Sequence, residues 1–392
     1  MLRGCDETTV RRALREREAL PGTRGFAGLV RDPPGIDADA ALVRDVLGRV
    51  PLFYETETED STAPDNSPTA PGNWSFRPHD LTAPEPVPAG TARTRGDNSG
   101  VLDHRVWTLP DPEPIDDDQK AVEAVRDAVD AALSDSPDAA IAFSGGVDSA
   151  LVASGVEGPL YVAGFPDSHD IEAARDAARA MGRAEDLSVV DLSLEAVEQA
   201  VPDVAHAIGR TNAIDVAIAL PLYLVAREVA RDGHDRLAVG QGADELFGGY
   251  AKVARAPDDP RVDADTIRGA RREVVETLPD QLVRDDLALR AAGVEPVAPL
   301  LDDRVVRAAL ALPGHLLVDD RGERKVALRR AARGRIPARV AFREKKAVQY
   351  GSLVSRELDR LARQAGFKRR MDGHVSQYVR ARVDSDCGSD SG

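Results

Sequence analysis

The chain of 392 residues contains only two cysteines, Cys5 and Cys387, which lie near its opposite ends. So few cysteines exclude the disulfide framework that stabilises small secreted domains. No apolar run reaches the roughly 18 residues that a membrane-spanning helix needs, and the first residues show no signal-peptide pattern. We therefore expect a soluble, cytoplasmic protein that is not inserted in a membrane.

Lysine and aromatic residues are also scarce. Of the 51 basic residues six are lysines, and aromatic residues make up 4% of the chain. Against these stand 67 acidic residues, which give a net charge of −16 and disfavour nucleic acid as a principal partner. Dense surface acid repels itself at low ionic strength and is screened at high salt. Acid in excess, with arginine in place of lysine, thus predicts a halophilic protein of haloarchaeal origin.

Residues 1–95 indicate a small, minimal α+β region. The pattern predicts a charged helix over 8–20 and short strands over 25–30 and 51–54, whereas residues 40–47 fit either a helix or a strand. Residues 55–73 are rich in Thr, Asp, Pro and Ser and predict a loop. Polar residues with several prolines and aspartates then predict a linker over 96–118.

The domain that we expect over 119–365 alternates strand and helix patterns. An amphipathic helix is predicted over 119–133 because its apolar residues recur at helical spacing. Predicted strands follow at 139–143, 160–165, 187–192 and 236–240, separated by helices that include 169–181, 194–208 and 215–231. This alternation predicts an α/β fold with a doubly wound parallel sheet and ligands at the carboxyl ends of its strands. A largely helical C-terminal part and a tail over 366–392 complete the chain.

The first stretch that carries chemistry follows the predicted strand at 139–143. It reads Ser144-Gly145-Gly146-Val147-Asp148-Ser149 and leads into a helix. Glycines let the backbone approach an anion closely, and the free amides of a helix start, together with two serine hydroxyls, favour phosphate. Asp148 fits such a cradle if a divalent cation bridges it to the phosphates. The alternative is an ordinary turn between a strand and a helix.

A second such stretch runs from Gly240 to Tyr250 and reads GQGADELFGGY. It also follows a predicted strand, so it falls on the same edge of the sheet as the first. Its four glycines permit close backbone approach, and Asp244 and Glu245 offer oxygen ligands for Mg²⁺. The alternative is an acidic helix start, in which both carboxylates complement the helix dipole.

Taken in order, these motifs resemble those of a known family. The loop at 144–149 resembles the pyrophosphate loop of the ATP pyrophosphatase superfamily, and 240–250 resembles the "GxGADELFGGY" element of asparagine synthetases. Three shorter elements resemble the family's later motifs: Glu295–Asp302, Lys325–Arg329 and Arg343–Lys345. The resemblance implies an adenine nucleotide α-hydrolase-like fold and an enzyme of the asparagine synthetase family.

The resemblance also implies a reaction and a site. ATP and Mg²⁺ would convert the side-chain carboxylate of aspartate into β-aspartyl-AMP, which ammonia then converts into asparagine. On this basis Ser144, Gly145, Gly146, Asp148 and Ser149 hold pyrophosphate, and Gly164, Phe165, Val239 and Gly240 line the nucleotide. Asp148 and Asp244 are the expected metal ligands. Lys325 is the expected catalytic cation, because adenylyl transfer needs positive charge where negative charge develops. Lys345 and Lys346 are weaker candidates, and Asp286 fits either the site or a structural ion pair.

Two positions depart from the family pattern. Gln241 stands where many members have an acid, and glutamine can orient a nucleophile by hydrogen bonding without accepting its proton. Val297 replaces the family's arginine, although a buried carboxylate usually needs a cationic partner. Two alternatives therefore stay open: a ligase, including a β-lactam-type synthetase, that uses a different carboxylate or amine, and a nucleotide-binding relative without catalysis.

The N-terminal region has a resemblance of its own. Arg44–Tyr54, Trp74–Phe76 and Val87–Thr91 resemble parts of N-terminal-nucleophile glutaminase domains. The resemblance implies that residues 1–95 are a degenerate glutaminase-like region, and the alternative is a chance apolar pattern. Those enzymes use cysteine as the mature first residue, with its own amine as base, whereas Leu2 stands in that place here. Cys5 would need a cleavage behind Gly4. We therefore expect no glutamine hydrolysis by this chain, with ammonia supplied free or by a separate glutaminase. The sequence leaves a homodimer open.

Overall fold

The computed structural model describes residues 1–56, 68–70, 72–95, 101–166, 168–256, 258–343 and 349–389. The chain forms two compact units. The first unit contains Met1–Ala132, Gln241–Val283 and Ala298–Ala331, and the second contains Leu133–Gly240, Arg284–Val297 and Ala332–Gly392. The expected domain over 119–365 therefore contributes to both units, and the first unit also holds the N-terminal region.

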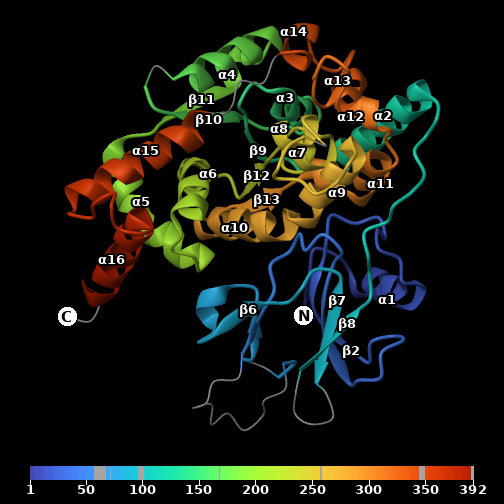
Figure 1. Cartoon of the computed structure of the whole chain (residues 1–392), viewed down its shortest axis with the longest axis horizontal. Helices are drawn as coiled ribbons and strands as arrows, with labels where there is room; N and C mark the ends of the chain where they lie inside the picture. The colour runs from blue at the N-terminus through green and yellow to red at the C-terminus, as the bar shows by residue number, and fades with distance from the viewer. Residues whose placement is uncertain are drawn as a thin grey trace. The chain divides into compact units, whose positions relative to one another are not determined.

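The N-terminal part of the first unit is built on antiparallel strands (Figure 1). Its five-stranded sheet has the order β1-β2-β3-β7-β8, and a smaller sheet has the order β5-β4-β6. The bounds are β1 (Leu2–Arg3), β2 (Ala27–Arg31), β3 (Ala40–Arg44), β4 (Phe53–Glu55), β5 (Trp74–Ser75), β6 (Pro84–Pro86), β7 (Thr91–Arg95) and β8 (Val101–Arg105), with helix α1 (Glu7–Glu16) and the 3₁₀ turn η1 (Pro78–Asp80).

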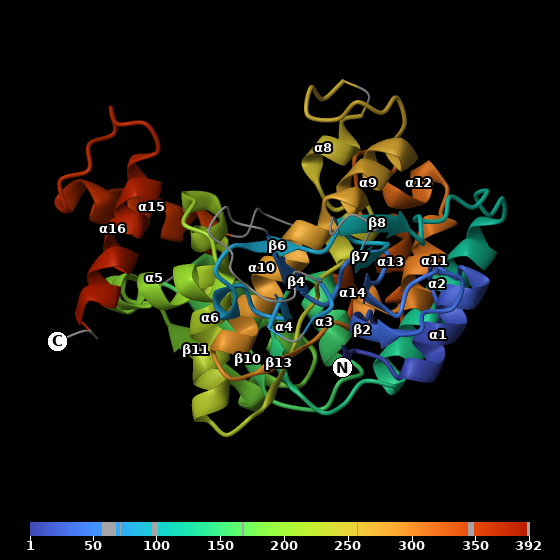
Figure 2. The same ribbon diagram turned by 90° about the horizontal axis from the view of Figure 1, so that it is seen from below.

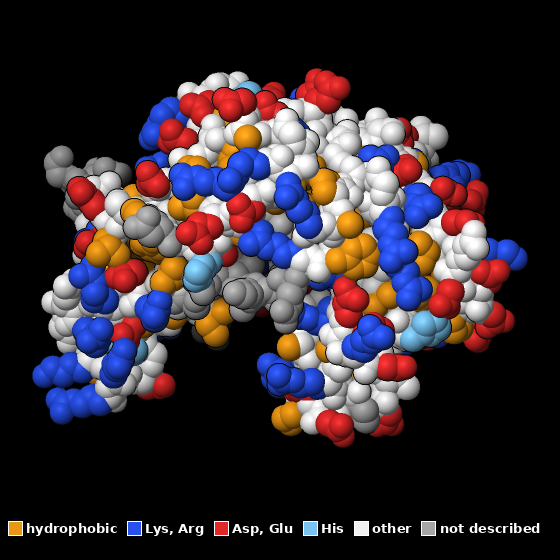
Figure 3. Space-filling model, turned by 90° about the horizontal axis from the view of Figure 1, so that it is seen from above, with side chains coloured by type: hydrophobic (Ala, Val, Ile, Leu, Met, Phe, Trp, Pro, Cys, Tyr) orange, Lys and Arg blue, Asp and Glu red, His pale blue; other side chains and the backbone are white. Residues whose placement is uncertain are grey.

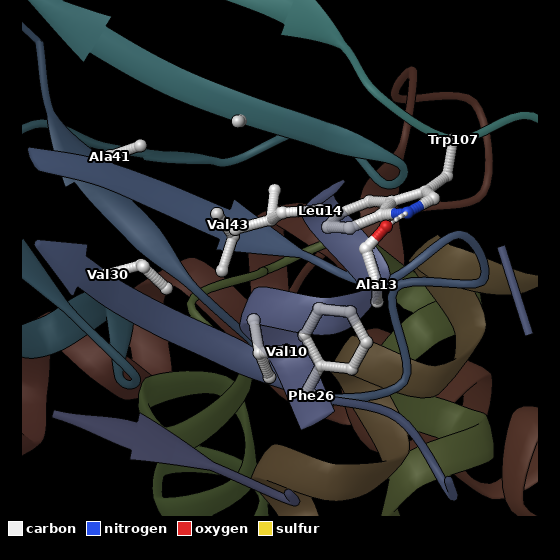
Figure 4. Packing of buried hydrophobic residues seen from close by; sticks show 9 residues of the cluster. Val10, Ala13, Leu14, Phe26, Val30, Ala41, Val43 and Trp107 are labelled. Atoms are coloured by element: carbon white, nitrogen blue, oxygen red, sulfur yellow. Dashed lines mark hydrogen bonds between the residues drawn. The ribbon is translucent and has the colours of Figure 1, made fainter. Parts of the chain in front are cut away.

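Strand β3 is buried on both faces, which explains its ambiguous sequence. Ala41 and Val43 pack in a cluster with Leu14 of α1 and with Trp107, whose Nε1 donates a 3.2 Å hydrogen bond to the carbonyl of Ala13 (Figure 4). Leu42 points the other way and joins a second cluster that includes residues of the smaller sheet. Alternate residues thus face two cores, so the run from Ala40 to Val43 is apolar and carries no period of two.

Sequence and structure differ at the linker. The predicted helix over 8–20 and the strands over 25–30 and 51–54 have counterparts in α1, β2 and β4. Residues expected to form a linker over 96–118 instead include β8, which pairs with β7, and Trp107, which is 1% exposed in the core. The sequence did not predict β8 as a strand, because this edge strand is mostly exposed and contains several polar residues. Much of the predicted loop over 55–73 lies outside the described residues.

The second unit contains the predicted parallel sheet, with the strand order β11-β10-β9-β12-β13. All neighbouring strands are parallel, and α4 and α6 cover opposite faces, so the doubly wound α/β prediction is confirmed (Figure 1). The bounds are β9 (Ala140–Ala142), β10 (Leu160–Gly164), β11 (Leu187–Asp191), β12 (Arg236–Ala238) and β13 (Glu295–Val297), with α4 (His169–Ala180) and α6 (Ala213–Arg231). Strand β13 was not predicted; it is short and contains Pro296, which an edge strand tolerates.

The remaining helices include those of the predicted, largely helical C-terminal part. Figure 2 shows α15 and α16 beside α5 and α6, and Tyr378 and Val379 of α16 are buried, so the predicted tail contains a packed helix. Those of the second unit are α3 (Val147–Ala153), α5 (Leu194–Ile208), α14 (Ala338–Ala341), α15 (Gln349–Gln364), α16 (His374–Ser389) and the 3₁₀ turn η2 (Ala184–Asp186). The first unit has α7 (Ala243–Leu246), α8 (Ala251–Ala254), α9 (Ile267–Glu276), α11 (Asp303–Leu310), α12 (Gly314–Leu317), α13 (Val326–Ala331) and the 3₁₀ turn η3 (Pro299–Leu301), while α2 (Asp118–Ser134) and α10 (Leu278–Ala291) include residues of both units.

The surface mixes charges of both signs. On the face shown in Figure 3, arginine and lysine side chains are interspersed with aspartate and glutamate. Pairs such as Arg179 with Asp176, 2.7 Å apart, are exposed and individually worth about 0–1 kcal/mol. Within the described part of the chain, no helix has the length and apolar character needed to cross a membrane.

Candidate active site

The predicted phosphate loop lies at the carboxyl end of β9 in the second unit. Gly145 has φ +73°, and a Cβ atom at this position would lie 2.5 Å from the carbonyl oxygen of Ala173. Only glycine fits this conformation and this approach without strain. The side chain of Ser149 closes the loop: its Oγ accepts a 3.2 Å hydrogen bond from the amide of Ser144 and lies 3.2 Å from the Ser144 hydroxyl. The two serine hydroxyls that the sequence singled out are therefore adjacent.

The end of β12 lies against this loop, so Val239 and Gly240 share the loop's edge of the sheet. Strand β12 pairs with β9, and a Cβ atom on Gly240 would lie 3.0 Å from the Cβ of Asp148 and 3.4 Å from the Ser149 amide nitrogen. Val239 is buried, with 4% of its surface exposed. The prediction that both motifs fall on one edge of the sheet holds for this part of the second motif.

Gly164 and Phe165 end the neighbouring strand, β10. A Cβ atom on Gly164 would lie 2.5 Å from Ser168 Oγ, the side chain that caps helix α4, so glycine is required for the close approach of strand and helix. Phe165 is half-buried and accepts a 3.1 Å hydrogen bond from the Ser168 amide through its carbonyl oxygen. All the predicted nucleotide-contacting residues thus lie on β9, β10, β12 and the segments that follow them.

The rest of the second motif belongs to the first unit, because the division between the units falls after Gly240. Asp244 lies in α7, and its Oδ1 is 2.8 Å from Nζ of Lys325. The Lys325 side chain is only 2% exposed, whereas that of Asp244 is 23% exposed. The structure therefore brings two predicted site residues into one ion pair, with the ammonium group on its buried side.

The local backbone is shaped to make this pair. Lys325 has φ +60°, a left-handed conformation that costs a residue other than glycine about 1 kcal/mol or more. Gly249 packs against both partners: a Cβ atom on it would lie 1.9 Å from Asp244 Oδ1 and 2.4 Å from Lys325 Cε. Arg324 donates a 2.6 Å hydrogen bond to the carbonyl of Gly249 and so links the two segments. Sequence reasoning missed Gly249 and Arg324, although the paired glycines of the motif were a signal.

The adjacent acids Asp244 and Glu245 have different environments. Glu245 is 7% exposed and accepts a hydrogen bond from the Tyr250 hydroxyl. Burial raises the pKa of its carboxyl above the ordinary 4.5; the Tyr250 hydrogen bond opposes this rise, and the nearby Asp244 carboxylate adds to it. Glu245 is therefore an internal hydrogen-bonding group, and Asp244 is the acid of this pair that keeps exposed surface.

Several other predicted positions can now be placed. Gln241 is half-buried at the start of the motif, and Val297 is 6% exposed at the end of β13. Asp286 forms a 2.9 Å ion pair with Arg290, which supports its structural alternative. Arg343 donates a 2.9 Å hydrogen bond to the carbonyl of Ala173, which also backs Gly145. Lys345 and Lys346 lie outside the described residues.

The donor set of the phosphate loop in the second unit fits the phosphates of ATP with a divalent cation. In the second unit, glycine positions where a side chain would clash line the phosphate loop, and Asp148 and two hydroxyls supply oxygen atoms. In the first unit, Asp244 has a carboxylate of its own, 23% exposed and paired with Lys325. Oxygen donors in small number suit Mg²⁺, which keeps several waters and binds through one or two carboxylates and the substrate phosphates. No group of three or more metal-ligating side chains occurs among the residues that the structure describes.

The chain is similar in sequence to known asparagine synthetases. The chain is 29% identical over 281 residues to a putative glutamine-hydrolyzing asparagine synthetase 1 of Methanocaldococcus jannaschii, covering 63% of this chain and 51% of that protein. It is 24% identical over 336 residues to asparagine synthetase B (glutamine-hydrolyzing) of Escherichia coli, covering 79% and 58%. The chain spans about half the length of these curated relatives.

The family model named asparagine synthase matches residues 120–273 and 258–383. The matched segments contain β9 to β13, the phosphate loop, Asp244 and Lys325. They take in more than half of the chain, which therefore belongs to the asparagine synthase family.

Proposed function

We propose that the protein is an AMP-forming, ATP-dependent ligase that converts a carboxylate into an amide. The leading candidate for this carboxylate is the side chain of aspartate. The observation that carries the proposal is the phosphate loop, where Gly145 with φ +73° and the adjacent hydroxyls of Ser144 and Ser149 lie between the end of β9 and the start of α3. Family membership supports ATP as the substrate. The relatives are named asparagine synthetases, which supports aspartate and asparagine as substrate and product.

The proposed reaction has two steps. An oxygen of the aspartate side-chain carboxylate attacks the α-phosphorus of ATP, the bond to the β-phosphate oxygen breaks, and pyrophosphate leaves. Ammonia then attacks the acyl carbon, AMP leaves with the bonding electron pair, and a proton is lost from nitrogen. Most of the catalysis in such transfers comes from positioning and charge stabilisation.

In the first step, Ser144, Gly145, Gly146, Asp148 and Ser149 would hold the departing pyrophosphate. Gly164, Phe165, Val239 and Gly240 would line the nucleotide. Asp148 and Asp244 would bind Mg²⁺, which when bound neutralises phosphate charge. Because Lys325 Nζ already contacts Asp244, we assign Lys325 to holding that carboxylate in place.

In the second step, Gln241 would orient ammonia by hydrogen bonding. Two observations support ammonia, free or from a separate glutaminase, as the nitrogen source. Leu2 and Arg3 form β1 and pair with β2, so cleavage behind Gly4 would remove a strand of the sheet. Burial also raises the pKa of the Cys5 thiol, which lowers its thiolate fraction.

One observation favours a second candidate, a ligase that acts on another carboxylate. Val297 is apolar and buried where the family resemblance leads us to expect an arginine. If Val297 contributes to the acyl pocket, the preferred acid has an apolar group in the place of one charged group of aspartate.

A single assay separates these candidates. The purified chain in molar KCl is given ATP, Mg²⁺ and ammonium, with aspartate or one of a panel of carboxylates, and pyrophosphate and AMP are measured. Release that depends on aspartate, with asparagine formed, is the expected result. Release only with another acid would establish the second candidate, and tight ATP binding without release from any acid would show a nucleotide-binding relative.

A further inference from the structure

A buried charge cluster in the first unit joins the N-terminal region to residues that follow β13. Arg49 lies between two aspartates: its Nε is 2.8 Å from Asp45 Oδ1 and its Nη1 is 2.7 Å from Asp303 Oδ1. The three side chains are at most 3% exposed. Buried charges are tolerated only when they are paired and hydrogen-bonded, and removing one partner leaves the other charge buried and uncompensated.

Asp303 is also held by backbone groups of the N-terminal region. Its Oδ2 accepts hydrogen bonds from the amides of Gly22 and Thr23, at 3.0 and 2.7 Å, and its own amide donates a 2.9 Å bond to the Thr23 carbonyl. Arg49 Nη1 donates a further 2.7 Å bond to the carbonyl of Leu301. These contacts fix both ends of the segment Leu301–Asp303, which links η3 to α11.

The same segment lies against the motif that begins at Gln241. Gly242 has φ +89°, and a Cβ atom on it would lie 2.5 Å from Leu301 Cδ2 and 3.4 Å from the carbonyl oxygen of Leu300. The turn containing Gln241 and Gly242 is thus packed directly on a residue whose backbone Arg49 holds. A continuous series of contacts runs from Arg49 through Leu301 to Gly242, entirely within the first unit.

We propose that Arg49 and Asp303 are positioning residues for the Gln241–Gly242 turn. The N-terminal region then serves the amide-forming site as a mechanical support. Its catalytic consequence rests on the proposed function, because Gln241 is there assigned to ammonia. Displacing a positioned group by about 1 Å can cost up to about a hundredfold in rate, so a loosened turn weakens the ammonia step while the phosphate loop, carried by β9, keeps its own contacts.

The test uses matched variants of the full chain. Arg49→Lys keeps the charge but loses the planar fork of donors, and Asp303→Asn keeps the volume but loses the charge. Arg93→Lys and Asp103→Asn make the same changes in another pair of the N-terminal region, whose nitrogen and oxygen atoms lie 2.6 and 2.7 Å apart. Hydrogen–deuterium exchange is measured on peptides covering 240–250, and circular dichroism checks that each variant is folded.

Faster exchange over 240–250 in Arg49→Lys and Asp303→Asn, with wild-type exchange in the controls, is expected. In the ligase assay the same two variants should need a higher ammonium concentration, with a KM raised about tenfold or more, while pyrophosphate release without ammonium is retained. Unchanged exchange in both folded variants, or an equal rise in the controls, would overturn the positioning role. Faster exchange in the two variants, combined with a wild-type chain that shows no ligase activity, would uphold the contact pathway and refute the proposed function.

Discussion

Lys325 and Asp244 form an ion pair in which the lysine is buried and the aspartate is partly exposed. The distance between Lys325 Nζ and Asp244 Oδ1 is 2.8 Å, and the lysine side chain is 2% exposed against 23% for the aspartate. The ammonium group therefore neutralises the carboxylate from within the protein and leaves its other face accessible. This asymmetry suits the role proposed for Asp244, a carboxylate held in a fixed orientation to bind a cation, and it leads to the first prediction.

Lys325→Ala and Asp244→Asn should each reduce kcat for pyrophosphate release by about 10²–10³, the cost of losing one preorganised charge-stabilising group. Because we expect Lys325 to act through Asp244, the double variant should be no worse than either single variant. Steady-state kinetics in molar KCl measure all three.

The control is Lys120→Ala, because the Lys120 side chain is 75% exposed and should leave kcat unchanged. Additive losses in the double variant would show that Lys325 acts on the substrate independently of Asp244. Equal activity of Lys325→Ala and the wild type would remove the lysine from the mechanism altogether.

Gly249→Ala should disrupt the same pair without removing either charge. The new Cβ would lie 1.9 Å from Asp244 Oδ1 and 2.4 Å from Lys325 Cε, so at least one of the two must move. We expect kcat to fall by about a hundredfold, as for other misplacements of about 1 Å. Gly233→Ala is the matched control because Gly233 has φ +89° and a Cβ atom on it would meet no other atom within 4 Å; it should lose stability without losing activity. Comparable activity in the two variants would contradict the prediction.

The sequence predicts the parallel sheet well, since its strands at 139–143, 160–165, 187–192 and 236–240 are apolar and separated by amphipathic helices. It fails where burial does not follow the period of the element. Residues 41–44 are buried on both faces, β8 is mostly exposed, and β13 contains a proline. Each of these strands depends on its neighbours in the sheet and not on its own pattern.

The candidate site shows the same limit. Close-approach glycines such as Gly145 are visible in a motif because backbone geometry leaves a local signature. The pairing of Asp244 with Lys325, and of Arg49 with Asp303, joins segments that are distant in the chain, so only the folded structure shows it. Glu245 makes the point for a single residue: in sequence it is equivalent to Asp244, yet it is buried and bonded to Tyr250.

Glu245→Gln should stabilise the protein at neutral pH. The folded state raises the pKa of this carboxyl above 4.5, chiefly through burial, so the folded protein binds the proton more tightly than the unfolded chain. Stability from this group is therefore fully present below pH 4.5 and is lost as the pH rises through the folded pKa. Glutamine is neutral at every pH and can still accept the Tyr250 hydrogen bond. The Tm difference between variant and wild type should be positive at pH 7 and shrink towards zero at pH 4; a difference independent of pH would contradict the assignment.

Salt should stabilise the chain strongly. The net charge of −16 creates self-repulsion, and the Debye length falls from about 10 Å at 0.1 M salt to about 3 Å at 1 M. Tm should therefore rise steeply with KCl up to about 1 M and more gently beyond it. Sodium chloride at equal ionic strength should act alike if screening is the cause. A Tm that does not change between 0.1 and 2 M KCl would contradict the predicted adaptation to salt.

Glutamine should not replace ammonium in the ligase reaction of this chain. A terminal cysteine nucleophile would require cleavage behind Gly4, and this would remove Leu2 and Arg3, which pair with Gly28 and Ala27 in the five-stranded sheet. Gly4 itself has φ +82°, and a Cβ on it would lie 2.3 Å from the Gly25 carbonyl oxygen, so the turn between β1 and Cys5 requires glycine and packs against Gly25.

We expect Cys5→Ser to keep full ammonium-dependent activity and the wild type to release no glutamate from glutamine. Mass spectrometry of the purified chain checks that β1 is retained. Glutamate release that Cys5→Ser abolishes, in a chain beginning at Cys5, would instead establish a working glutaminase.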